Sequence, residues 1–390
     1  MDRIRIARWT PAWFATGAAM LIAALLALLT GHGTVWEAGE TRAILHLLVL
    51  GWVGTVMIGA LLQFVPVLAA APLAWPGLAP VVLALWAAGV LSLSAGFWAD
   101  IPQAMAVAAA LLPLATAMAL AMLIPPVLAA LRRERLMLLL AVGLAGMAGA
   151  VAMGAGFALS RAGGDGLPLL PEWRAVHASL GLGLWLSFTA MAVSLKFLAM
   201  FGLAPAAPNR ALTVMAIGAV LAVAVPLAAP LVVAVYVVTV VRMLRARRLP
   251  RLDPSLRGAL GAGVALVLAA LLPGVTGGMA LVLGWLSGLT LAFLPKILAF
   301  LTWIEVFGPR IGHAPVPATS ALSDGRQVLA GLALWALGVA LMAAGVMQAG
   351  AGVLLCAAAI VLCECLRVRR LSHLPADDRP PHPSLFLIQP

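Results

Sequence analysis

Charge is scarce in this sequence. Only 9% of the 390 residues are Asp, Glu, Lys or Arg, whereas 64% are hydrophobic. A typical soluble domain has about 25% charged and about 45–50% apolar residues, so a soluble globular protein is excluded. Apolar segments long enough to cross a bilayer occupy almost the whole chain, which predicts an all-helical, polytopic membrane protein.

Cysteine is also rare. Cys356, Cys363 and Cys365 are the only three, and they are too few and too clustered for a disulfide framework. The Cys363/Cys365 pair is a candidate metal site, but a tetrahedral ion needs further ligands, so we interpret both as helix-end thiols. The sequence has no G-x-x-x-x-G-K, H-E-x-x-H or C-x-x-C motif, which excludes the best-known nucleotide, zinc-protease and dithiol sites.

The hydrophobic runs predict twelve transmembrane helices. The seventh and eighth runs are the least distinct, because Pro226 and Pro230 lie between them and two short spans there could be a single kinked one. The first run follows a basic N-terminus but has no convincing cleavage site, so we interpret it as a retained helix. The twelve runs are 11–30, 42–70, 78–98, 103–130, 136–159, 173–203, 211–228, 230–245, 257–273, 277–305, 327–346 and 350–367.

The basic residues indicate the orientation of these helices. If all twelve cross the membrane, the N-terminus, the even-to-odd loops and the C-terminal tail carry 19 arginines, and the opposite side carries only Arg42, Arg161 and Arg174. Lys and Arg in short loops favour the cytoplasm, so both termini are expected to be cytoplasmic. This distribution explains the net charge of +11 without a nucleic-acid partner.

Three of the predicted helices resemble one another. When they are aligned on Trp52, Trp185 and Trp285, a polar residue follows each tryptophan by eleven positions, namely Gln63, Lys196 and Lys296. The only two lysines of the chain thus share one repeat position. We interpret them as side chains that extend to lipid phosphates, with proton entry or anion binding as the alternative. Each aligned helix is the second of four, which predicts three units near 1–130, 131–250 and 251–370, followed by a tail at 371–390.

Two histidines precede the aligned tryptophans. His46 lies six residues before Trp52, and His177 lies eight residues before Trp185, both near the outer end of their helices. Intramembrane histidine is costly and is often functional, so His46 is a candidate haem ligand and His177 a candidate haem or copper ligand. Met279 occupies the repeat position of His46, and a thioether can be an axial haem ligand. The alternative for each is helix packing.

The topology and the sequence His46-Leu-Leu-Val-Leu-Gly51-Trp52 resemble subunit I of the haem-copper oxidases, a fold that nitric-oxide reductases share. The stretches 46–66, 177–201 and 283–303 look especially like small, divergent oxidase-like proteins of bacteria. The resemblance implies haem b, with copper as a second candidate. It assigns His46 to the position of a low-spin haem ligand and His177 to that of a copper ligand.

Most catalytic positions of that family are not matched. The resemblance implies a histidine pair on the seventh helix and two histidines on the tenth, but 211–228 and 277–305 contain none. Gly181 stands where a tyrosine often follows the sixth-helix histidine. Terminal oxidase activity is therefore not expected.

Three functions follow from these observations. The first is an oxidase-like protein of the bacterial inner membrane that binds haem and serves electron transfer, a response to nitric oxide or oxygen, or the support of a respiratory complex. Its partners would be the lipid bilayer and a respiratory electron donor or oxidase subunits. The second is a twelve-helix transporter with an anionic substrate at Lys196 or Lys296, and the third is a structural subunit without cofactor.

Overall fold

A computed structural model of the chain describes residues 3–35, 37–311 and 315–371, so the predicted tail lies outside the described residues from position 372 onward. Within these ranges all regular secondary structure is helical, and no strand is present. In chain order the helices are α1 (Arg3–Leu29), α2 (Gly39–His46), η1 (Leu47–Gly54), α3 (Thr55–Ala69), η2 (Pro76–Leu78), α4 (Ala79–Trp98), α5 (Pro102–Ala130), α6 (Leu136–Arg161), α7 (Pro171–Ala178), η3 (Ser179–Ser187), α8 (Phe188–Phe201), α9 (Asn209–Ala224), α10 (Ala228–Arg245), α11 (Pro254–Leu271), α12 (Gly274–Met279), η4 (Ala280–Ser287), α13 (Gly288–Val306), η5 (Gly308–Arg310), η6 (Thr319–Ala321), α14 (Gly325–Ala343) and α15 (Met347–Arg370).

In the described part of the chain, eleven helical segments are long and apolar enough to cross a membrane. The expected twelfth segment is α9, which is apolar but has only 16 residues. At about 1.5 Å per residue it rises roughly 24 Å, less than the roughly 30 Å of a hydrocarbon core. The break between α9 and α10 falls at Pro226, where the sequence pattern was least distinct. The architecture is that of a polytopic membrane protein.

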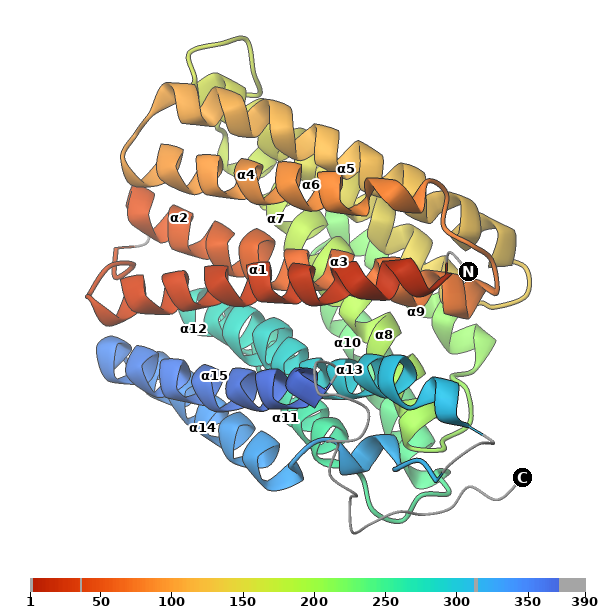
Figure 1. Cartoon of the computed structure of the whole chain (residues 1–390). Coiled ribbons are helices and arrows are strands. Elements are labelled where there is room, and N and C mark those ends of the chain that lie inside the picture. The colour runs from red at the N-terminus through yellow and green to blue at the C-terminus, as the bar shows by residue number, and fades with distance from the viewer. Residues whose placement is uncertain (1–2, 36, 312–314, 372–390) are drawn as a thin grey trace.

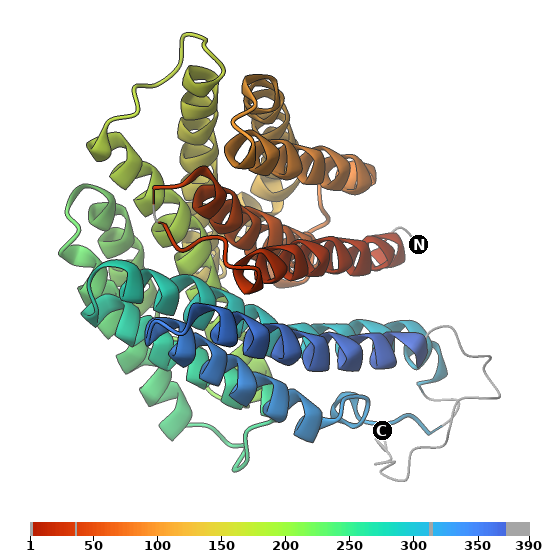
Figure 2. The ribbon, with the colours of Figure 1, turned by 90° about the vertical axis from the view of Figure 1, so that its left-hand side faces the viewer.

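The helices form a closed ring around three central segments. Consecutive long helices pack side by side, and α1 packs against α15, so the first and last helices close the ring. Figures 1 and 2 show this contact as red beside blue in two perpendicular views. Each central segment is built from three consecutive helices: α2–η1–α3, α7–η3–α8 and α12–η4–α13. The middle parts η1, η3 and η4 contact one another pairwise.

The three central segments share an unusual backbone feature. Each contains a π-helical stretch of two turns, and these stretches hold Trp52, Trp185 and Trp285, all of which are fully buried. π-helical hydrogen bonds run from residue i to i+5 and are rare in proteins, where they often mark functional sites. All three stretches therefore lie at nearly the same position relative to the aligned tryptophans.

Tryptophans from neighbouring helices donate to the π-helical backbone. Trp335 Nε1 lies 2.8 Å from the Leu283 carbonyl oxygen, and Trp86 Nε1 lies 3.3 Å from that of Leu50. Leu50 and Leu283 each stand two residues before an aligned tryptophan, so a similar interaction occurs at two of the three. Both carbonyls also accept a backbone N–H, and Trp86 donates to Thr55 Oγ1 at 3.1 Å as well, so it is the indole N–H groups that gain partners in an interior without water.

Candidate functional site

A cavity of about 590 Å³ opens at one end of the bundle, between the first and second central segments. Its walls come from α2, η1, α4, α6, α7 and η3, with smaller contributions from α5. We call this the histidine end, because both His46 and His177 line the cavity. The structure therefore brings together two residues that are 131 positions apart in the chain. This volume is within the roughly 300–1,000 Å³ of typical ligand sites.

His46 is the last residue of α2 and is held in a defined orientation. Its Nδ1 lies 2.7 Å from the carbonyl oxygen of Arg42, one turn earlier on the helix. A carbonyl only accepts hydrogen bonds, so Nδ1 carries the proton and Nε2 is left with its lone pair. The ring also stacks on Phe97 of α4, with centroids 5.1 Å apart. A histidine whose Nδ1–H is fixed by a carbonyl is a common form of metal-ligating imidazole.

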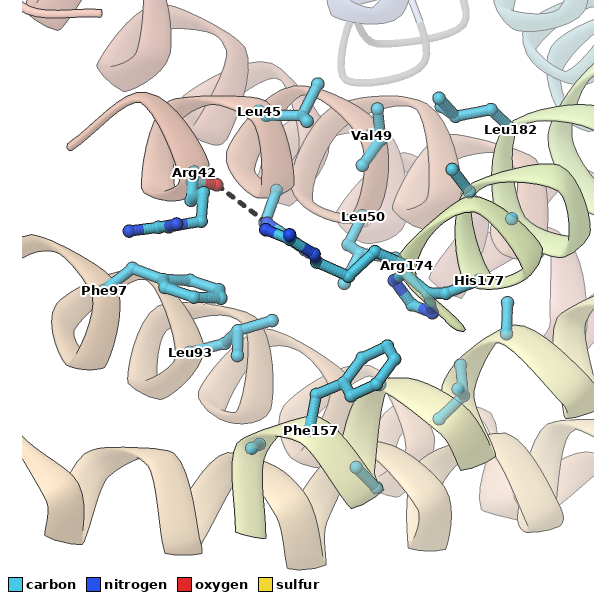
Figure 3. A pocket seen from close by; sticks show the side chains of 18 of the residues that line it. Arg42, Leu45, Val49, Leu50, Leu93, Phe97, Phe157, Arg174, His177 and Leu182 are labelled. Carbon is cyan, nitrogen blue, oxygen red and sulfur yellow. Dashed lines mark hydrogen bonds between the residues drawn. The ribbon is translucent and has the colours of Figure 1, made fainter. Parts of the chain in front are cut away.

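His177 enters the same cavity from α7 with a different environment. Its Nδ1 is buried and makes no hydrogen bond of good geometry with the described residues, although the backbone of Ala150 is a weaker hydrogen-bond partner of the ring. The ring packs edge-on against Phe157, with centroids 5.6 Å apart. Gly154 makes room for it, since a Cβ there would lie 3.1 Å from His177 Cε1. Figure 3 shows His177 and Phe157 side by side in the cavity.

Three arginines, Arg42, Arg161 and Arg174, also line the cavity. The guanidinium carbons of Arg42 and Arg161 lie 5.8 and 5.4 Å from the centroid of the Phe97 ring, so the two stack on one aromatic side chain. Glu37 is the one acidic residue that lines the cavity among those described. The lining therefore carries an excess of positive charge, which favours an anionic group on a ligand.

The arginines have incomplete partners of their own. Arg161 Nη1 lies 3.7 Å from Oδ1 of Asp100, whose side chain is almost fully exposed, so this ion pair is weak. Arg42 Nε is buried and has no hydrogen-bond partner within the described part of the chain. Sequence reasoning did not assign these arginines to the site. Their position could have indicated a role, because they are the three arginines that lie on the side of the membrane opposite to the other nineteen.

Met279, the third candidate ligand, does not line this cavity. It is the last residue of α12, which packs chiefly against α11, α14 and η4. The two histidines are therefore the predicted ligands that the structure brings together.

Lys196 and Lys296 lie near the other end of the bundle, which we call the lysine end. Lys196 Nζ is 3.3 Å from Glu134, just before α6, and Lys296 Nζ is 2.8 Å from Asp253, just before α11. The sequence-based interpretation was that these lysines extend to lipid phosphates. In the structure each lysine instead forms an ion pair within the protein. The cause is the fold, which places an acidic residue beside each lysine at the start of the preceding long helix.

A second cavity, of about 350 Å³, lies between the second and third central segments. Ser179, which occupies the repeat position of His46, lines it. None of the described residues that line this cavity is charged. The two cavities thus lie at equivalent interfaces but differ in chemistry, and only the first offers imidazole and guanidinium groups.

The residues of the first cavity form a small ligand set for a separate metal ion. No group of three or more His, Cys, Asp or Glu side chains is placed to hold an ion among the described residues. Cys363 is exposed and Cys365 is buried, so the thiols of this pair face different surroundings. A haem brings four iron ligands of its own, so two imidazoles would be enough to hold one.

In comparisons with known proteins, no family model matches this chain and no curated sequence matches it.

Proposed function

We propose that the chain is a membrane haem protein in which His46 and His177 bind haem b. The observation that carries the proposal is the convergence of two imidazoles, from separate units of the chain, in one cavity. His46 is already fixed by the Arg42 carbonyl with its Nε2 unprotonated, so this nitrogen would be free to bind the haem iron. When bound, haem supplies one-electron chemistry at potentials that its axial ligands and surroundings set.

The arginines of the cavity support a haem over a neutral ligand. Haem carries two propionate carboxylates on one edge of an otherwise apolar ring. Arg42, Arg161 and Arg174 offer guanidinium groups, and Phe97 and Phe157 offer apolar walls. Arginine binds carboxylates in a planar, two-pronged geometry, which makes it the preferred partner for such an edge.

The proposal includes a relationship to subunit I of the haem-copper oxidases, with α9 as a short twelfth span. A ring of helices around three central segments, with His46 on the first and His177 on the second, supports it. Since the other oxidase histidines and the active-site tyrosine have no counterpart, we propose electron transfer or a response to nitric oxide or oxygen, or support of a respiratory complex. Copper has less support, because the cavity offers only two imidazoles. We place the protein in a bacterial inner membrane with cytoplasmic termini.

A transport function has less support than haem binding. The stretches η1, η3 and η4 contact one another pairwise, and their tryptophans Trp52, Trp185 and Trp285 are fully buried. Toward the lysine end, Phe197 contacts Phe64 and Phe293 from the two other central segments, with centroids 4.8 and 4.6 Å apart. Aromatic side chains from all three units thus close the path that a central substrate would take.

A reduced-minus-oxidised visible spectrum of the detergent-purified chain tests the proposal, with haem quantified as its pyridine haemochrome. We expect b-type bands and close to one haem per chain. His46→Ala should lose the haem, whereas His32→Ala is a matched control, since His32 lies at the same end of the bundle but does not line the cavity. A colourless wild-type protein, purified from cells with ample haem, would refute the proposal.

A further inference from the structure

The two histidines of the cavity are not held equally. Nδ1 of His46 donates to the Arg42 carbonyl at 2.7 Å, and the ring stacks on Phe97. Nδ1 of His177 is buried without a hydrogen bond of comparable geometry among the described residues, and the backbone of Ala150 is only a weaker partner of its ring. A carbonyl at Nδ1–H makes imidazole a stronger metal ligand and fixes its orientation, and loss of such a partner typically weakens metal binding about 10–100-fold.

The helices that carry the two histidines differ in the same sense. α2 buries Ala43 and Ile44 and packs against α1, α4 and η1. In α7 none of the eight residues is buried, and the helix packs chiefly on α6 and η3. Local opening needs the least energy where few apolar contacts must be broken, so the α7 end of the cavity is the part that moves more easily.

Space beside His177 depends on one glycine. A Cβ at Gly154 would lie 3.1 Å from His177 Cε1 and about equally far, 3.8 and 3.9 Å, from its two ring nitrogens. Contacts of 3.1 Å are tighter than ordinary van der Waals packing, so any larger side chain at this position would displace the ring.

We propose that His46 is the permanent axial ligand and His177 the exchangeable one, so that a neutral diatomic molecule binds on the His177 side. This inference rests on the proposed function. With haem bound, the bond between His177 and the iron would break and one bond to the diatomic ligand would form, with no electron or proton transferred. Carbon monoxide is the probe, because it binds reduced haem without redox chemistry. The apolar lining around His177, including Phe157 and Leu182, admits such a molecule without a desolvation cost.

The test compares haem content and carbon monoxide binding of the whole purified chain in three variants. His46→Gly should lower the haem per chain at least tenfold, and added imidazole should restore it, which separates ligand loss from misfolding. His177→Gly should keep its haem, become five-coordinate when reduced, and bind carbon monoxide at least tenfold faster than wild type. Gly154→Ala should also speed carbon monoxide binding while both histidines remain.

The outcomes separate this inference from the proposed function. A wild-type chain without haem refutes both. Haem in the wild type, with equal loss in His46→Gly and His177→Gly, leaves the haem proposal standing and overturns the assignment of unequal roles. Retention of haem in His46→Gly and loss in His177→Gly would overturn it as well, by reversing the two roles.

Discussion

Asp253 joins the start of one helix to the middle of another through its two carboxylate oxygens. Oδ1 accepts the backbone N–H of Leu256 at 3.0 Å, and Oδ2 accepts Nζ of Lys296 at 2.8 Å. Glu134 repeats the arrangement in the second unit, where Oε1 is 3.4 Å from the backbone N of Leu136 and Oε2 is 3.3 Å from Lys196. The only two lysines of the chain therefore fix equivalent helix pairs.

We expect Lys296→Met to destabilise the protein, because Asp253 would remain partly buried without its cation. The side chains of the pair are 14% and 17% exposed, so the loss should be about 1–3 kcal/mol, below the 3–5 kcal/mol of a fully buried pair. Thermal unfolding in detergent measures it. Lys296→Met with Asp253→Asn should recover part of the loss, since Asn still caps the helix. Equal stability of the wild type and the single variant would contradict a structural role for the pair.

Gly146 sets the distance between α6 and η3. A Cβ there would lie 2.8 Å from the backbone nitrogen of Trp185, closer than real Cβ atoms come, so Gly146→Ala should push the two helices apart and lower stability by about 1–3 kcal/mol. Gly261→Ala is the matched control, because it lies in α11 with open space around its Cβ. Its expected effect is neutral or stabilising by up to about 1 kcal/mol. If both variants unfold at the same temperature, the close approach at Gly146 does not matter.

Trp335→Phe should destabilise the third central segment. The variant keeps the aromatic ring but removes the N–H donor 2.8 Å from the Leu283 carbonyl, which then keeps only the backbone hydrogen bond that ends the π-helical stretch. The expected cost is about 0.5–1.5 kcal/mol, read from thermal unfolding. Trp98→Phe is a control for the substitution itself, since Trp98 is 40% exposed. A loss at Trp98 as large as that at Trp335 would count against the hydrogen bond as the cause.

Arg174→Gln should lower the reduction potential of the proposed haem. A nearby cation favours the reduced state, which carries one positive charge fewer, so its removal favours the oxidised state. A loss of about 1.4 kcal/mol in the electrostatic interaction corresponds to a shift of roughly 60 mV in a one-electron reduction potential. Because solvent screens the charge at this exposed site, the shift in potential should be smaller than that. A spectroelectrochemical titration measures it. Arg210→Gln, outside the cavity, should leave the potential unchanged; a potential that is the same or higher in Arg174→Gln would contradict propionate binding by this residue.

The sequence could predict much of the bundle but only part of the site. Long apolar runs with breaks at Pro and Arg were enough to place the membrane-spanning helices, since burial of a helix in lipid requires that pattern. The aligned tryptophans predicted an internal repeat, and the π-helical stretches occur at them. The π-helical backbone itself has no reliable sequence pattern. The unit boundaries at 130 and 250 remain a prediction.

The offset between the two histidines shows why the cavity could not be predicted. His46 is six residues before its tryptophan and His177 is eight, and two positions on an α-helix differ by about 200°. When the two helices are aligned on their tryptophans, the histidines therefore point in nearly opposite directions. From the sequence alone, this would argue against both of them lining one cavity. In the ring, however, the side of the first central segment that faces the second is opposite to the side of the second that faces the first. The offset therefore brings both imidazoles to the interface between these two segments. Only the packing order reveals this.

The closed ring has a consequence for the order of the units along the chain. Because α1 packs against α15 as other neighbouring helices pack against each other, the interface between the third and first units does not depend on a covalent link. α1 begins and α15 ends at the lysine end, where the chain also passes from α5 to α6 and from α10 to α11. A circular permutant that opens at one of those connections and joins the old ends would preserve every helix contact, including the interface that holds the histidine cavity. The closed ring therefore allows more than one order of the helices along the chain with the same contacts between them.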